Sequence, residues 1–312
     1  MTPRSSPAQS NGPAAGDQSF RVSIAYMQPA DPALQEILDI LKDRHVLEKI
    51  QEMLSPVRWP EQLTIMSAEC GVVNSWYRRE LLKPVVTLCY EFLKHILQSL
   101  PTGTTPDGIT PADAAVGQFL WVALHETGHA TFDILDVPIF GSAEDAADNF
   151  ATYVLLHFGK NQARRLMLGA AWAWRAYLGD YKKNPVVPLR LAAFASDHGL
   201  PQERYYNLLC LAVGAQPEVF RDLEPYLPST RTPRCASEYQ RLAHAFRKVI
   251  DPHVDPEIRK TSIRCELAGE LGVESSFSEI GYSTNFLIVS RPESPNGASP
   301  RQVPWRKQRR YH

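Results

Sequence analysis

The feature that most constrains this chain is the sequence His-Glu-Thr-Gly-His at residues 125–129, directly after the apolar stretch Val116–Leu124. The apolar stretch predicts a buried helix that continues through the motif. On a helix, His125 and His129 leave from one face one turn apart, so two imidazole nitrogens can reach a single zinc ion. Glu126 is then placed to take a proton from zinc-bound water. The alternative is a core helix with two surface histidines and a solvated glutamate.

A catalytic zinc ion needs a third protein ligand, and we predict Glu144. Val137-Pro138 ends the first helix, and Ser142 begins the next one as an N-cap. Glu144 then lies in the first helical turn, where the helix dipole favours an ionised carboxylate. Asp148 follows one turn later on the same face and can accept a hydrogen bond from a ligand histidine. The alternative third ligands are Asp133, Asp145 and Asp148, of which Asp145 better fits the helix cap.

This order of residues resembles the gluzincin pattern of zinc peptidases, in which Glu-x-x-Ala-Asp-x-x-Ala follows the histidine motif; here it spans residues 144–151. The chain also resembles, over about residues 65–255, a bacterial family of metallopeptidases of unknown function. The matching stretches are Glu69–Gly71, Asn74–Tyr77, Leu88–Glu91, Asp136–Pro138, Arg204–Cys210 and Leu227–Cys235. The resemblance implies a fold and a metal, but no substrate. Only 15 positions separate His129 from Glu144, without the long insertion of thermolysin, so we expect a compact core.

The same resemblance bears on the cysteines, because Cys70, Cys89, Cys210 and Cys235 match cysteine positions in the family. It implies that in an oxidising compartment Cys70 pairs with Cys89 and Cys210 with Cys235, which leaves Cys265 free. The alternative is that Cys89 and Cys210 are reduced, buried, small apolar side chains.

The remaining patterns predict an α+β fold: a small mixed sheet packed on the His-Glu-x-x-His helix, with a mostly helical C-terminal half, as in zincins. Strands are expected at 20–26, 63–66 and 85–90, and a loop at 74–83. Helices are expected at 32–53, 90–100, 112–135, 143–158, 161–178, 189–196, 204–213, 217–223 and 236–250. We expect one metallopeptidase domain at 20–262, a disordered segment at 1–19, and a weakly structured extension with a basic tail at 263–312. The strand at 85–90 is our candidate for strand addition by substrate, or else it is a purely structural strand.

Composition excludes several classes of function. The net charge of −1 argues against nucleic acid as a partner, and no run approaches the roughly 18 apolar residues of a membrane span. No apolar leader follows Met1, which favours the cytoplasm. Family relatives look exported, however, so a trimmed start would make the protein periplasmic or secreted, and its localisation stays open.

We therefore expect a zinc metallopeptidase that acts on a peptide or protein through Glu126-assisted attack of zinc-bound water. His198, oriented by Asp197, is expected to stabilise the oxyanion, with Tyr77, Tyr205 and Tyr206 as alternatives. Two other functions stay open: a non-catalytic, zinc-stabilised interaction module, and a zinc hydrolase of a non-peptide amide. The intact Glu126 argues against the first, because a structural site has no use for that carboxylate.

Overall fold

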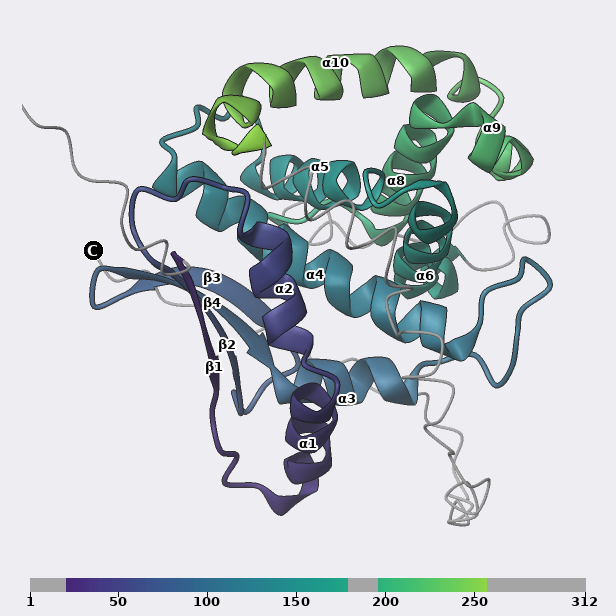
Figure 1. Ribbon diagram of the computed structural model, residues 1–312. Coiled ribbons are helices and arrows are strands. Elements are labelled where there is room, and N and C mark those ends of the chain that lie inside the picture. Colours follow the sequence, from purple (N-terminus) through teal and green to yellow (C-terminus); the bar gives the residue numbers. More distant parts are fainter. Residues whose placement is uncertain (1–20, 179–195, 257–312) are drawn as a thin grey trace, which may run out of the picture. The chain divides into compact units, whose positions relative to one another are not determined.

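The computed structural model describes residues 21–178 and 196–256, all of which belong to one unit of the chain (Figure 1). The segments expected to lack structure, 1–19 and 263–312, lie outside the described residues. The expected helix at 189–196 lies outside them too, except for its last residue. In the described part the fold is α+β, with a small mixed sheet and mostly helices, as predicted.

The described sheet has four strands in the order β1-β2-β4-β3. Strands β1 (Val22–Tyr26), β2 (Leu63–Ala68) and β4 (Lys83–Cys89) run parallel, and β3 (Ser75–Glu80) pairs antiparallel with β4 at the edge. β2 alternates between buried and half-buried residues, and β4 is buried from its second residue onward. Such patterns are typical of strands whose covered face packs on helices.

The prediction of a loop at 74–83 is wrong, because this segment forms β3 and a tight hairpin to β4. Arg78, Arg79 and Glu80 mask the strand pattern, since an edge strand carries charged residues that face water. The turn itself consists of Leu81 and Leu82, both in the left-handed region with φ of 49° and 69°. Asn and Gly normally occupy such a turn, so the sequence offers no turn signal here.

The single helix expected at 32–53 is also wrong. The chain forms a 3-10 turn η1 (Pro32–Leu34), helix α1 (Gln35–Asp43) and helix α2 (Val46–Leu54). The break falls at His45, which has a φ of 52°. Apolar periodicity continues on both sides without glycine or proline, so the sequence pattern does not reveal the break.

Helix α4 (Pro111–Ile134) is the central element and carries the histidine motif. Thr110 and Asp113 form a capping box at its start, and Pro111 occupies the first turn. The other helices are α3 (Tyr90–Gln98), α5 (Ala143–Leu155), α6 (Lys160–Leu178), α8 (Pro201–Ala215), α9 (Pro217–Phe220) and α10 (Cys235–Val249), with short 3-10 turns at Arg221–Tyr226, Thr232–Arg234 and Asp251–His253. α4 contacts β3 and β4 as well as α5 and α6, so it separates the sheet from the later helices (Figure 1).

The two largest apolar clusters meet at α4. Phe119 and Ala123 face the cluster under the sheet, whereas Trp121 and Leu124 face the cluster built with α6 and α8. A helix with apolar residues on both sides is expected to be buried. α4 and α6 approach closely at a glycine pair: a Cβ on Gly117 would lie 2.6 Å from backbone atoms of α6. The motif helix is therefore held rigidly from both sides.

Two disulfides tie the described residues together. Cys70, just after β2, is bonded to Cys89 at the end of β4, and Cys210 in α8 to Cys235 at the start of α10. This confirms the pairing that the family resemblance implied, and the alternative of reduced, buried Cys89 and Cys210 is wrong. Cys265 lies outside the described residues.

Candidate metal centre

Three ligand-type side chains converge where α4 faces the start of α5. His125 Nε2 lies 3.2 Å from His129 Nε2 and 3.1 Å from Glu144 Oε2, and His129 Nε2 lies 3.6 Å from the same oxygen. Ser142 caps α5 by accepting a hydrogen bond from the Asp145 amide, and this places Glu144 in the first turn. The structure thus brings His125, His129 and Glu144 together.

Gly128 lets the two helices approach at this point. A Cβ there would lie 3.2 Å from the Ala147 Cα and from the Phe150 Cβ, both on α5. Such contacts are tighter than side chains usually tolerate, so α5 would have to move away from α4. The small residue inside the motif therefore helps to hold Glu144 within reach of the histidines.

The donor atoms fit a metal in kind and in spacing. Two imidazole nitrogens and one carboxylate oxygen form a common ligand set of catalytic zinc. Donors on a tetrahedral zinc ion with bonds of about 2.0–2.1 Å lie about 3.3 Å from one another. The three separations here, 3.1, 3.2 and 3.6 Å, bracket that value. The described residues of this cluster therefore could hold a metal ion.

Asp148 lies behind the cluster and sets the orientation of His125. The Nδ1 of His125 is 2.7 Å from Asp148 Oδ1, which leaves its Nε2 to face the other ligands. Burial alone would raise the pKa of Asp148, but hydrogen bonds from His125 and Arg204 outweigh it and lower the pKa. An ionised Asp148 accepts a hydrogen bond from Nδ1–H, which leaves the lone pair on Nε2 free.

Arg204 is a residue that the sequence analysis did not assign to the site. It donates two hydrogen bonds of 2.7 Å to the two Asp148 oxygens, from a position 56 residues further along the chain. Its guanidinium lies over the rings of Trp121 and Trp174, at 4.9 and 5.1 Å. Helical spacing could not find this contact, because it joins α5 to α8. The only signal was that Arg204 lies in a stretch shared with the resembling family.

Glu126 is buried beside the ligands, with 8% of its surface exposed. Burial raises its pKa above the ordinary range, and the two nearby histidines only partly offset that effect. The backbone N–H of Tyr77 donates to Glu126 Oε2 at 2.8 Å. The strand beside Glu126 is therefore β3, at the sheet edge. The expected strand at 85–90 falls mostly in β4, which is buried between β2 and β3 and so matches the alternative of a structural strand, with no edge free for substrate addition.

His198 also reaches this cluster. Its Nε2 lies 2.8 Å from Glu144 Oε2, its ring stacks on that of His125, and half of its side chain is exposed. Among the described residues, no hydrogen bond joins Asp197 to His198. His198 thus borders the ligands without the orienting partner that the sequence analysis expected.

The other candidates lie elsewhere. Asp133 accepts hydrogen bonds from the hydroxyl of Tyr77 and from Arg79, so it faces β3 and not the histidines. Asp145 is exposed at the cap of α5. Tyr205 is buried, which raises its pKa to about 12, and its ring packs against that of Tyr206.

No helix in the described ranges has both the length and the apolar character needed to cross a membrane. Residues 26–250 match the model of a protein family described as "Putative metallopeptidase". The comparison with curated proteins and the comparison with solved structures gave no match.

Proposed function

Because the chain belongs to this "Putative metallopeptidase" family, we propose that it is a zinc-dependent peptidase of the gluzincin type, with a zincin-like arrangement of sheet and motif helix. The observation that carries the proposal is the convergence of His125, His129 and Glu144 beside a buried Glu126. Structural zinc sites usually have four protein ligands. The described cluster offers three, which favours a catalytic site over a zinc-stabilised interaction module.

In this proposal His125, His129 and Glu144 hold the zinc ion. When bound, the ion supplies a Lewis acid that lowers the pKa of a water molecule and polarises the substrate carbonyl. Asp148 keeps His125 in the tautomer that presents Nε2, and Arg204 keeps Asp148 ionised and in place.

Glu126 is the proposed general base. It accepts a proton from the attacking water and then delivers it to the leaving amine. The Tyr77 N–H donates a hydrogen bond to Glu126 Oε2. Among the described residues no hydrogen bond reaches Glu126 Oε1, which leaves that oxygen for the water. Burial raises the pKa of Glu126, and a carboxylate with a raised pKa is a stronger base.

The free edge of β3 is the proposed place for the substrate backbone. Among the described strands β3 pairs only with β4, and the Tyr77 N–H points from its other edge toward Glu126. An extended peptide added to that edge would place its carbonyl groups beside the base. His198, which is half exposed beside Glu144, is our candidate donor to the oxyanion.

The test compares the wild type with Glu126→Gln in the digestion of a peptide library, with and without a chelator. We expect the variant to keep its zinc, measured by metal analysis, and to lose about 10²–10⁴-fold in rate, because an amide cannot accept the proton. Glu36→Gln, at an exposed position on α1, is the matched control. Near wild-type turnover in Glu126→Gln would refute the mechanism. Cleavage of acyl amides but of no peptide would refute the substrate class.

A further inference from the structure

A pocket with a volume of about 400 Å³ lies next to the metal ligands. Helices α5, α8 and α10 contribute most of its lining, and Trp121 of α4 contributes to one side. His125, His129, Glu144, Glu126 and His198 do not line it. It shares Asp148, Arg204 and Trp121 with the surroundings of the metal centre, because Trp121 stacks on His125. Pockets that bind small molecules have volumes in this range.

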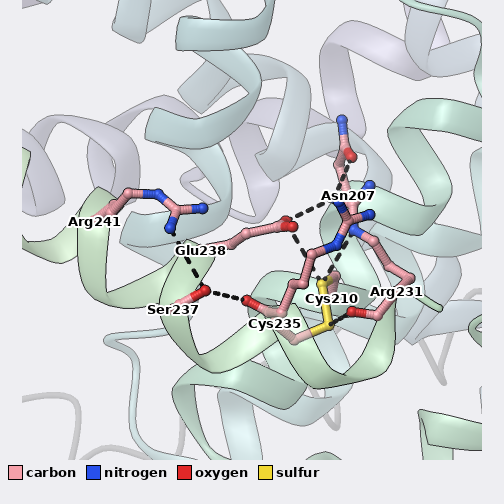
Figure 2. Close-up of a disulfide and its surroundings, with 8 residues drawn as sticks. Asn207, Cys210, Arg231, Cys235, Ser237, Glu238 and Arg241 are labelled. Carbon is pink, nitrogen blue, oxygen red and sulfur yellow. Dashed lines mark hydrogen bonds and ion pairs between the residues drawn. A yellow bond between two sulfur atoms is a disulfide. The ribbon is translucent and has the colours of Figure 1, made fainter. Parts of the chain in front are cut away.

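Some polar side chains of the lining already form hydrogen bonds within the protein. Arg231 donates to Asn207 Oδ1 at 2.8 Å and to Glu238 Oε2 at 2.7 Å, beside the Cys210–Cys235 disulfide (Figure 2). Arg204 is likewise held by Asp148. The disulfide joins α8 to α10, so this side of the pocket is fixed before a ligand arrives.

Other polar side chains of the lining have few or no partners among the described residues. The Thr152 side chain is buried, at 2% exposure, yet no hydrogen bond reaches its hydroxyl among the described residues. The Asn149 amide has no partner in the same part of the chain. Arg241 has one long contact, 3.5 Å to Ser237 Oγ (Figure 2). The Asp145 carboxylate forms no ion pair with a described residue. These side chains are therefore available to form hydrogen bonds or ion pairs with a molecule in the pocket.

The charges of the lining narrow the kind of ligand. The pocket combines three arginines with three carboxylates, so it has no net formal charge and disfavours polyanions and metal cations. Arg241 and Asp145, which form no ion pair with a described residue, carry charges of opposite sign. Asn149 and Thr152 add an amide and a hydroxyl group to the lining, and Leu208, Leu211 and Leu242 add apolar side chains.

We propose that this pocket is a binding site for a small zwitterion with an apolar side chain, a free amino acid or a short peptide. Arg241 receives the carboxylate, Asp145 the ammonium group, and the leucines the side chain. Such molecules are also products of a peptidase. That link alone rests on the proposed function; the binding site itself does not.

The test is calorimetric titration of the full-length protein in the Glu126→Gln background, so that no probe is hydrolysed. The probes are L-leucine, N-acetyl-L-leucine, which lacks the ammonium group, and L-leucinamide, which lacks the carboxylate. We expect L-leucine to bind most tightly. Each modified probe should bind about tenfold or more weakly, which is the scale of a lost charge-assisted hydrogen bond.

Variants then locate the bound probe. Arg241→Gln and Asp145→Asn should each weaken L-leucine binding by about tenfold or more, whereas Arg247→Gln, at an exposed position on α10, should not change it. His129→Ala, which disables the metal centre, should leave it intact. Asp145 and Arg241 are both exposed, so neither substitution should unfold the protein.

Two results would overturn the proposal. One is the absence of any binding at millimolar L-leucine. The other is L-leucine binding that is abolished by His129→Ala but not by Arg241→Gln, because the probe would then occupy the metal centre. Neither result touches the proposed function, which the peptide digest tests separately.

Discussion

Replacing Asp148 with Asn keeps the shape of the side chain and removes its charge. Asp148 accepts a hydrogen bond of 2.7 Å from His125 Nδ1, and two of 2.7 Å from Arg204. An asparagine offers one accepting oxygen and one NH₂ group, which only donates. An NH₂ group in the place of Oδ1 faces both the His125 N–H and one Arg204 N–H, and in the place of Oδ2 it faces the other Arg204 N–H. At least one donor is therefore left without an acceptor.

The substitution should affect both the metal affinity and the folding stability, by different amounts. Loss of such a partner behind a ligand histidine typically costs about 10–100-fold in metal affinity, or about 1.4–2.7 kcal/mol. Breaking a buried ion pair costs about 3–5 kcal/mol of folding stability. We expect the low end, about 3 kcal/mol, because Arg204 keeps its contacts with Trp121 and Trp174.

Zinc affinity is measured by competition with a chromophoric chelator, and stability by urea unfolding of the metal-free protein. The double variant Asp148→Asn/Arg204→Met removes the guanidinium that the single change leaves unpaired. It should regain part of the stability but none of the zinc affinity. An unchanged dissociation constant in Asp148→Asn, or full recovery of affinity in the double variant, would show that Asp148 does not support His125.

Three further predictions concern the fold. Replacing both Cys210 and Cys235 with Ala should destabilise the protein by about 3 kcal/mol in urea unfolding, because the bond closes a loop of 25 residues; the reduced wild type, which lacks the Cys70–Cys89 bond as well, should lose at least as much. Gly117→Ala should lower stability by at least about 2 kcal/mol, since its methyl group would meet the α6 backbone, and an unchanged melting temperature would contradict that contact. Leu81→Asn with Leu82→Gly should stabilise the hairpin by about 1 kcal/mol, because both positions have positive φ and both leucines are exposed; a lower melting temperature would contradict this.

The sequence predicts those parts of the site whose geometry is local. The motif helix, the cap at Ser142 and the placement of Glu144 and Asp148 on one face of α5 all follow from helical spacing. Arg204 does not, because its contact depends on how α8 docks on α5, which no short-range pattern encodes.

The same distinction explains the errors in the fold. β3 was missed because charges at a sheet edge hide the alternation of a strand, and because Leu81 and Leu82 occupy a turn that ordinarily requires Asn and Gly. The break at His45 has no glycine or proline to announce it. The cysteine pairs came from resemblance to a family, since spacing alone cannot choose among connectivities.

The separation between local and distant contacts has a consequence for the order of folding. His125, His129 and Glu144 all lie within 20 consecutive residues, so the entropy lost in bringing them together is small. Asp148 meets Arg204 only after α6 and α8 have docked. A partly folded chain could then gather the three ligands early, but His125 would lack its support. Tight metal retention would thus mark the chains that have completed their fold.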